Sequence, residues 1–303
     1  MAEARHAITL IGYGEAGGIL GDEWVARGDC AVRCYDIKLA DPQQRDALRD
    51  KAQHGGVTLH DDLARAVEGG QLIVSVVTAA SALDVVRDCA AHLRPGQLFL
   101  DFNSVAPATK RQAQAFIEAS GADYLDVAVM APVPPSRLQV PLLIGGRRAE
   151  ETAERLEALG MNARAVSDEV GVASAIKMCR SVMIKGLEAL TLECLSTARH
   201  YGAECEVLDS LQQSFPGMGW DGVLPNYLIS RIAEHGARRS AEMQEVARTV
   251  ADAALRPRMS LAAAQTQGGL VDIMQRQGLN YDARQPFDWK CLMDALDTSS
   301  PSG

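Results

Sequence analysis

The chain contains 303 residues, with 30 Lys and Arg against 39 Asp and Glu, and 47% of its residues are hydrophobic. The net charge of −9 argues against a nucleic-acid-binding protein, because phosphate backbones are bound by basic surfaces. At about 100–200 residues per domain, this length predicts two domains, each with an apolar core.

The cysteines and histidines indicate neither a disulfide framework nor a zinc site. The seven cysteines form no C-x-x-C pair, and the six histidines form no H-x-x-x-H pair. No apolar run approaches the roughly 18 residues of a membrane span, and residues 1–7 lack the apolar stretch of a signal peptide. We therefore expect a metal-free cytoplasmic protein that has neither a membrane nor a nucleic acid as its partner.

The first half of the chain alternates short apolar runs with helical patterns. Leu72–Val77 is too apolar to have one face in water and predicts a central strand of a parallel sheet. Strands separated by helices of about 10–15 residues indicate βαβ units with right-handed crossovers. The other predicted strands are Ala7–Ile11, Ala31–Tyr35, Leu98–Phe102, Asp123–Val129 and Pro141–Ile144, and the predicted helices are Gly17–Arg27, Ser81–Leu93 and Thr109–Ser120. This pattern predicts an α/β Rossmann domain, a doubly wound parallel sheet, over residues 1–167.

The second half predicts an all-helical domain over residues 168–303. A helical pattern without proline extends from Val170 to Tyr201, and Gly202 is a typical stop signal. A stretch rich in Pro, Gly and aromatic residues, 215–220, separates it from further helices at Ile229–Leu255 and Leu261–Gln277. The change in pattern places the domain boundary near Ser167.

A glycine-rich loop follows the first predicted strand. Gly12-Tyr13-Gly14-Glu15-Ala16-Gly17 fits G-x-G-x-x-G and opens a helix, so its glycines allow a tight turn and a close approach of the backbone to a pyrophosphate. Asp36 ends the second strand, where a carboxylate accepts hydrogen bonds from ribose hydroxyls and repels a 2′-phosphate. We expect NAD to be preferred over NADP, although Lys38 weakens this preference. A plain tight turn, or an adenosylmethionine-dependent methyltransferase, remains an alternative.

Two further motifs resemble those of the β-hydroxyacid dehydrogenases, which include 6-phosphogluconate and 3-hydroxyisobutyrate dehydrogenases. Asp101-Phe-Asn-Ser-Val-Ala-Pro107 resembles the D-x-S-T-x-x-P segment of this family, and Gly171-Val-Ala-Ser-Ala-Ile-Lys177 resembles its G-x-G-x-x-x-K segment on a long interdomain helix. The resemblance implies that Asn103 and Ser104 contact nicotinamide and substrate, that Val77 and Thr78 lie beside the adenosine ribose, and that Lys177 is the catalytic lysine. It also implies a homodimer.

The expected substrate pocket departs from the family pattern. Met130-Ala131-Pro132 stands where the family has S-G-G for the substrate carboxylate, and Arg180-Ser181 replaces the pair that usually follows the lysine. Arg231, His235, Arg238, Arg239 and Glu242 recur at helical spacing. They form either an anion clamp, in which His235 and Arg239 bind the substrate, or a solvated face with an Arg238–Glu242 pair.

On a helix, Lys177 shares its face with Arg180, Ser181 and Lys185. Nearby cations and partial burial lower the pKa of a lysine, so we expect a neutral amine that takes the substrate's hydroxyl proton as hydride leaves for nicotinamide. The substrate-binding candidates are Ser104, Met130, Ala131, Arg180, Ser181, His235 and Arg239.

The sequence thus predicts an NAD(P)-dependent dehydrogenase that acts on a small anionic 3-hydroxy acid or sugar acid. Imine reduction on the same scaffold is the nearest alternative, although relatives that catalyse it usually replace the lysine. A catalytically silent NAD-binding sensor is the other alternative, favoured by the departures at Met130 and Arg180.

Overall fold

The computed structural model describes residues 6–282 and 286–298 and divides the chain into two compact units. Unit 1 comprises Met1–Lys177 and unit 2 comprises Met178–Gly303. The division lies within one continuous helix, α8 (Val172–His200), whereas the boundary expected from the sequence follows Ser167.

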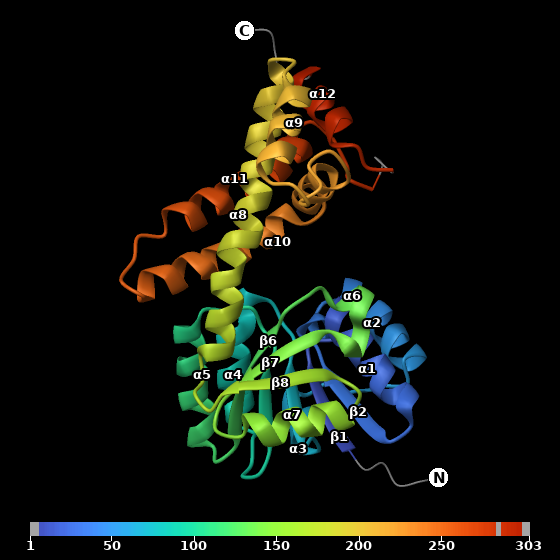
Figure 1. Cartoon of the computed structure of the whole chain (residues 1–303). Coiled ribbons are helices and arrows are strands. Elements are labelled where there is room, and N and C mark those ends of the chain that lie inside the picture. The colour runs from blue at the N-terminus through green and yellow to red at the C-terminus, as the bar shows by residue number, and fades with distance from the viewer. Residues whose placement is uncertain (1–5, 283–285, 299–303) are drawn as a thin grey trace. The chain divides into compact units, whose positions relative to one another are not determined.

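Unit 1 is built on one eight-stranded sheet with the order β3-β2-β1-β4-β5-β6-β7-β8 (Figure 1). All neighbouring strands are parallel except β6 and β7, which are antiparallel. The parallel sheet predicted from the sequence is therefore present over β1–β6, and its last two strands, β7 and β8, run in the opposite direction, which the sequence did not reveal. The strands are β1 (His6–Ile11), β2 (Cys30–Tyr35), β3 (Thr58–Leu59), β4 (Leu72–Ser75), β5 (Leu98–Asp101), β6 (Asp123–Val129), β7 (Pro141–Gly145) and β8 (Asn162–Ser167).

Both faces of this sheet are covered by apolar side chains. Because successive side chains of a strand point to opposite faces, Leu72 and Val74 of β4 belong to one core cluster and Ile73 to the other. All three side chains are fully buried, as expected for a central parallel strand. The helices of unit 1 are α1 (Glu15–Arg27), α2 (Pro42–His54), α3 (Leu63–Glu68), α4 (Ala82–Ala90), α5 (Pro107–Ala119), α6 (Val133–Ser136) and α7 (Ala149–Ala158), with short 3-10 turns at Ile37–Ala40, Ala79–Ser81 and Arg137–Gln139.

Unit 2 is helical and has its own core. Leu195, Ile229 and Leu292 lie at its centre and are fully buried. Gly236 lets the backbones of two helices approach closely, since a Cβ atom there would lie 2.4 Å from the carbonyl oxygen of Gln267. The helices are the remainder of α8, α9 (Glu204–Ser214), α10 (Leu224–Asp252), α11 (Arg258–Arg276) and α12 (Trp289–Thr298).

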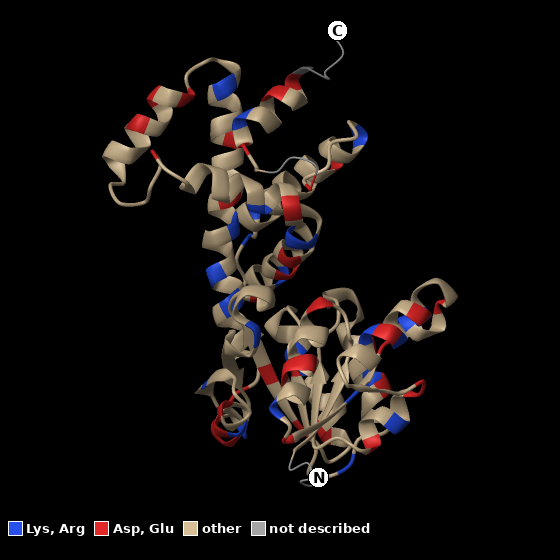
Figure 2. Ribbon diagram, turned by 90° about the vertical axis from the view of Figure 1, so that its right-hand side faces the viewer, with Lys and Arg blue, Asp and Glu red and all other residues tan. Residues whose placement is uncertain are grey.

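No helix within the described parts of the chain is both long enough and apolar enough for a bilayer crossing. Acidic and basic residues are interspersed along the helices of each unit, as the colours of the ribbon in Figure 2 show.

Candidate active site

The glycine-rich loop connects β1 to α1, and its conformation explains two of its three glycines. Gly12 has a φ of +98°, and a Cβ atom there would lie 2.3 Å from the carbonyl oxygen of Val76. A Cβ atom at Gly17 would lie 2.2 Å from the carbonyl oxygen of Gly12. A Cβ atom at Gly14, by contrast, meets nothing within 4 Å. The loop is therefore tightly packed at its two ends and open at its middle glycine, directly before the N-terminus of α1.

Asp36 holds this loop from the end of β2. Its Oδ2 accepts a hydrogen bond from the backbone N–H of Tyr13 at 2.8 Å, and its Oδ1 accepts one from the N–H of Lys38 at 2.9 Å. The residue is only 6% exposed. Each carboxylate oxygen retains a further lone pair, so the acid that the sequence singled out lies beside the loop and can still accept a hydroxyl hydrogen bond.

The side chain of Tyr13 points into the core rather than toward the open side of the loop. Its hydroxyl donates to Asp22 of α1, and burial, followed by this hydrogen bond, raises the pKa of Tyr13. The prediction that Tyr13 contacts the cofactor is therefore limited to its backbone.

Three strand ends meet beside the loop. Since β1 is followed in the sheet by β4 and β5, and all three are parallel, the residues after Ile11, Ser75 and Asp101 lie along one edge. The chain leaves β1 toward β2 and later returns to the other side of β1 at β4. Such a reversal of strand order is where open α/β sheets bind ligands.

Asn103 joins two of these strand ends. Its Oδ1 accepts a hydrogen bond from the N–H of Val77 at 2.7 Å, and its Nδ2 donates to the hydroxyl of Ser75 at 2.9 Å. The side chain is 4% exposed, so it fixes the loop after β4 against the loop after β5. Thr78, next to Val77, exchanges a hydrogen bond with Ser81 at 3.1 Å.

Lys177 contacts the next residue of the same loop. Its Nζ donates a hydrogen bond to the hydroxyl of Ser104 at 2.5 Å, although 73 residues separate the two in sequence. Both residues belong to unit 1, and Ser104 follows Asn103 at the strand edge described above. A lysine amine and a serine hydroxyl therefore face each other at the edge of the sheet where open α/β folds bind ligands.

The residues after β6 provide apolar surface. Met130 packs against the cluster of Ala128, Leu143 and Ala173, and Ala131 packs against the larger core cluster of the sheet. In the described residues, neither side chain brings a charge to the position where the resemblance implies a carboxylate site.

In unit 2, the predicted anion clamp is paired with carboxylates. Arg239 contacts Glu188 at 2.9 Å, His235 contacts Glu234 at 3.4 Å, and Arg238 contacts Glu242 at 2.7 Å. The Arg238–Glu242 pair is the contact expected of the solvated-face alternative.

Burial shapes the titration of this patch. Burial raises the pKa of Glu188, opposed by Arg239, while burial and then Arg231 lower the pKa of His235. His235 is therefore biased toward the neutral imidazole, which weakens its case as an anion ligand.

In the part of the chain that the structure describes, Arg180 and Ser181, which follow Lys177 on α8, do not contact carboxylates as the residues of the predicted clamp do. Ser181 is 7% exposed and receives a long hydrogen bond, 3.4 Å, from Lys185, whose Nζ also contacts Glu242 at 2.6 Å. Arg180 is exposed, and within the described residues no carboxylate forms a salt bridge with it.

Comparison with known protein families agrees with this geometry. The model of the NAD binding domain of 6-phosphogluconate dehydrogenase matches residues 7–167, which is more than half of the chain. The chain belongs to this family. Its N-terminal domain is thus an NAD-binding domain of the dehydrogenase type, which argues against the methyltransferase alternative. A second model, a domain of unknown function, matches residues 198–269.

Individual relatives agree with the family. A conserved hypothetical protein from Sinorhizobium meliloti 1021 is 39% identical, with a TM-score of 0.79, over 97% of this chain and 96% of its own. A conserved protein of unknown function, described as structurally similar to 3-hydroxyacid dehydrogenases, is 29% identical, with a TM-score of 0.70, over 88% of this chain and 97% of its own. The 3-hydroxyisobutyrate dehydrogenase of Pseudomonas aeruginosa is 24% identical over 70% of this chain and 71% of its own.

The family's dinucleotide fits the residues present. The open space at Gly14 is where a pyrophosphate would approach the N-terminus of α1, whose first backbone N–H groups have no partner within the helix. Any larger residue in place of Gly12 or Gly17 would clash with a backbone carbonyl group and prevent this loop conformation. The two glycines are therefore of the kind that a dinucleotide-binding loop requires.

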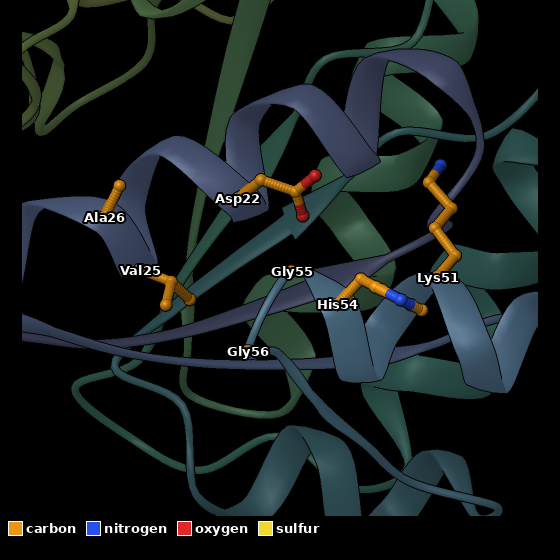
Figure 3. Close-up of a pocket in the computed structure, with 7 residues that line it drawn as sticks. All are labelled: Asp22, Val25, Ala26, Lys51, His54, Gly55 and Gly56. Atoms are coloured by element: carbon orange, nitrogen blue, oxygen red, sulfur yellow. The ribbon is translucent and has the colours of Figure 1, made fainter.

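A separate hollow lies behind the loop, between α1 and α2 (Figure 3). None of the predicted site residues lines it, so we do not assign the site to it. Its lining residues are Asp22, Val25, Ala26, Lys51, His54, Gly55 and Gly56.

Sequence reasoning missed one cation at the loop. Lys51 of α2 donates to the carbonyl oxygens of Gly14 at 2.6 Å and Tyr13 at 3.1 Å and lies over the Tyr13 ring, 4.7 Å from its centroid. Because Lys51 binds the carbonyl oxygens of Tyr13 and Gly14, these two groups point toward α2 and away from the ligand-facing side of the loop. No signal in the sequence pointed to it, because a lysine in a polar helix is ordinarily solvated.

Proposed function

We propose that the chain is an NAD(P)-dependent dehydrogenase that oxidises the carbinol carbon of a small anionic 3-hydroxy acid or sugar acid, with NAD preferred. The observation that carries this proposal is the contact between Lys177 and Ser104 at the ligand-binding edge of an NAD-binding domain. A lysine amine held beside a serine hydroxyl has the geometry of a group that accepts and returns a substrate proton.

The dinucleotide, when bound, supplies a nicotinamide ring that accepts the hydride from the carbinol carbon. As that C–H bond breaks, the neutral amine of Lys177 takes the hydroxyl proton, and the electron pair of the broken O–H bond forms the second bond of the carbonyl. In the reverse direction the ammonium of Lys177 returns the proton. Ser104 fixes the position of the amine nitrogen of Lys177. A substrate hydroxyl group bound beside the amine would also contact the hydroxyl of Ser104.

Several residues would hold the dinucleotide. Gly14 and the N–H groups of Glu15, Ala16 and Gly17 would receive the pyrophosphate, and Asp36 would accept the ribose hydroxyls. A 2′-phosphate would place its charge against the Asp36 carboxylate, which supports the preference for NAD. Val77, Thr78, Asn103 and Ser104 lie farther along the same edge and would line the remainder of the cofactor.

Arg180 is the strongest candidate for the substrate's anionic group. It lies three residues after Lys177 on α8, and its guanidinium is exposed and unmatched by a carboxylate among the described residues. Arg239, by contrast, already has Glu188 as its partner, and His235 is biased toward its neutral form. Arg180 therefore comes before both in our proposal, with Ser181, Met130 and Ala131 as further contacts.

We also propose a homodimer formed through unit 2. Large apolar side chains are exposed there, including Met183 at 74% and Leu190 at 57% on α8 and Tyr227 at 58% on α10. Measurement of the molar mass in solution by light scattering tests this, and a monomer at all concentrations would refute it.

The function is tested with a panel of 3-hydroxyisobutyrate, L-serine and 6-phosphogluconate, each with NAD⁺ and NADP⁺. The intact chain should reduce NAD⁺ with one of them, and Lys177→Met should lower kcat at least about 100-fold while binding NADH normally. Lys290→Met, a surface lysine of α12, is the control and should behave as the unmodified chain. Undiminished turnover by Lys177→Met would refute the mechanism. If the chain oxidised none of the hydroxy acids but reduced a cyclic imine with the reduced dinucleotide, imine reduction would replace the proposed function.

A further inference from the structure

Two buried carboxylates lie side by side beneath the candidate site. Asp101 of β5 and Asp126 of β6 are register partners on neighbouring parallel strands, and they are 1% and 0% exposed. Two adjacent buried anions repel each other strongly at low dielectric. Lys110 of α5, itself fully buried, lies between them, with its Nζ 3.1 Å from Asp101 Oδ1 and 3.5 Å from Asp126 Oδ1.

Asp101 holds the loop that carries Ser104. Its Oδ1 accepts a hydrogen bond from the backbone N–H of Asn103 at 2.9 Å, and its Oδ2 accepts one from the hydroxyl of Tyr124 at 2.6 Å. Lys110 also donates to the main-chain carbonyl oxygen of Asp101 at 2.6 Å. The start of the loop is thus fixed by both the side chain and the main chain of Asp101.

Asp126 holds the first turn of the helix that carries Lys177. Its Oδ2 accepts hydrogen bonds from the N–H of Gly171 at 3.1 Å, the N–H of Ser174 at 3.0 Å and the hydroxyl of Ser174 at 2.8 Å. A carboxylate at this place satisfies N–H groups that a helix cannot satisfy itself and interacts favourably with the helix dipole. Lys177 follows Ser174 by three residues, so it lies on the same side of the helix one turn later.

The other oxygen of Asp126 depends on Lys110. Asp126 Oδ1 has no hydrogen-bond partner among the described residues, so its charge is offset by the lysine ammonium at 3.5 Å. Lys110 therefore connects the anchor of the Ser104 loop to the anchor of the Lys177 helix. The hydrogen bond between Lys177 and Ser104 joins the same loop and helix a second time.

We propose that Lys110, Asp101 and Asp126 are positioning residues that set the distance between the Ser104 hydroxyl and the Lys177 amine. A buried ion-pair cluster is a poor source of net stability compared with apolar packing, because each charge loses its hydration. Its effect here is geometric, since it couples two separate segments that carry the reacting pair. This inference rests on the proposed function for its kinetic consequence, but the geometry it describes is independent of any substrate.

The test uses Lys110→Met and Asp126→Asn, with Asp123→Asn as the matched control. Asp123 is the first residue of the strand that has Asp126 at its middle, and it pairs with Arg147 and Arg148. Two measurements are made on the full-length chain. The first is the rate at which acetic anhydride acetylates Lys177, followed by peptide mass spectrometry, and the second is kcat and KM with NAD⁺ for whichever of 3-hydroxyisobutyrate, L-serine and 6-phosphogluconate the unmodified chain oxidises. NADH affinity is measured in parallel by fluorescence titration.

In the Lys110→Met and Asp126→Asn variants, acetic anhydride should acetylate Lys177 several times faster than in the unmodified chain, because the amine loses its fixed hydroxyl partner. They should also lower kcat about tenfold to a hundredfold, the cost of misplacing a reacting group by about 1 Å, while Asp126→Asn leaves NADH affinity unchanged. Asp123→Asn should alter none of these quantities. If Lys110→Met fails to fold, Ser174→Ala removes one hydrogen bond to Asp126 without disturbing a charge and should change kcat and acetylation in the same direction.

Folded variants with the acetylation rate and kcat of the unmodified chain would overturn the positioning role. A failure of the proposed function has a different signature, because no hydroxy acid would be oxidised even by the unmodified chain. The acetylation measurement still decides the positioning role in that case.

Discussion

Alanine at Gly14 and alanine at Gly17 should separate cofactor binding from stability. A methyl group at position 14 enters open space, and the residue, with a φ of −71° and a ψ of −147°, lacks the positive φ that favours glycine. A methyl group at position 17 would lie 2.2 Å from the carbonyl oxygen of Gly12, well inside van der Waals contact. The first substitution therefore disturbs an incoming ligand, and the second disturbs the folded chain.

The expected magnitudes follow from these distances. Displacing the pyrophosphate from one charge-assisted hydrogen bond costs about 2 kcal/mol, so Gly14→Ala should weaken NADH binding about 30-fold. At an NADH concentration of about 100 times the original Kd, ligand stabilisation falls from about 2.7 to about 0.9 kcal/mol. Gly17→Ala should cost about 1–3 kcal/mol through overpacking, which lowers the thermal midpoint by about 2–12 °C.

The assay combines NADH fluorescence titration with thermal unfolding, with and without NADH. Gly186→Ala is the control, because a methyl group there also meets nothing within 4 Å but lies within α8, far along the chain from the loop. It should leave NADH affinity unchanged. Unchanged NADH affinity in Gly14→Ala, or an undiminished thermal midpoint in Gly17→Ala, would refute this interpretation of the loop.

Three further predictions concern single side chains. Lys177→Met should abolish most turnover and leave NADH affinity intact in a fluorescence titration, and a parallel loss of affinity would show that the lysine acts in binding instead. Asp36→Ala should weaken NADH binding about tenfold and NADPH binding less, so that equal losses in two titrations would contradict the ribose assignment. Burial, followed by Arg33, lowers the pKa of His60. The unfolded chain therefore takes up this proton first, and stability is lost as the pH falls through the unfolded and then the folded pKa. His60→Gln should thus lose less thermal stability than the unmodified chain between about pH 7.5 and 5.5, and equal losses would count against it.

The sequence predicted the fold best for strands whose side chains are buried on both faces of the sheet. Strands such as β4 are buried on both faces, and an apolar run records that directly. The helix α2 was missed because it buries only Leu48 and Ala52, so its sequence carries almost no apolar stripe. The reversed direction of β7 and β8 was also missed, because strand polarity depends on which neighbour a strand pairs with and not on its own residues.

The candidate site divides in the same way. The glycine loop was recognisable because its constraints are local, within a few residues of Gly12. The contact between Ser104 and Lys177 joins distant segments and was not predicted, although the resemblance to a family had assigned each residue separately to the site. The burial of Lys110 had no signature at all, because its environment is created by two aspartates on strands that flank its helix.

The order in which the chain is synthesised gives this lysine a second significance. Asp101, Lys110 and Asp126 all lie within one strand–helix–strand segment, residues 98–129, so both acids and their counter-charge leave the ribosome together. The partners of Asp126 at the start of α8, Gly171 directly before the helix and Ser174 in its first turn, follow more than a strand and a helix later. Because domains fold progressively during synthesis, this segment can bury its acids without waiting for distant residues. The anchor for the lysine-bearing helix is therefore ready before that helix has been made.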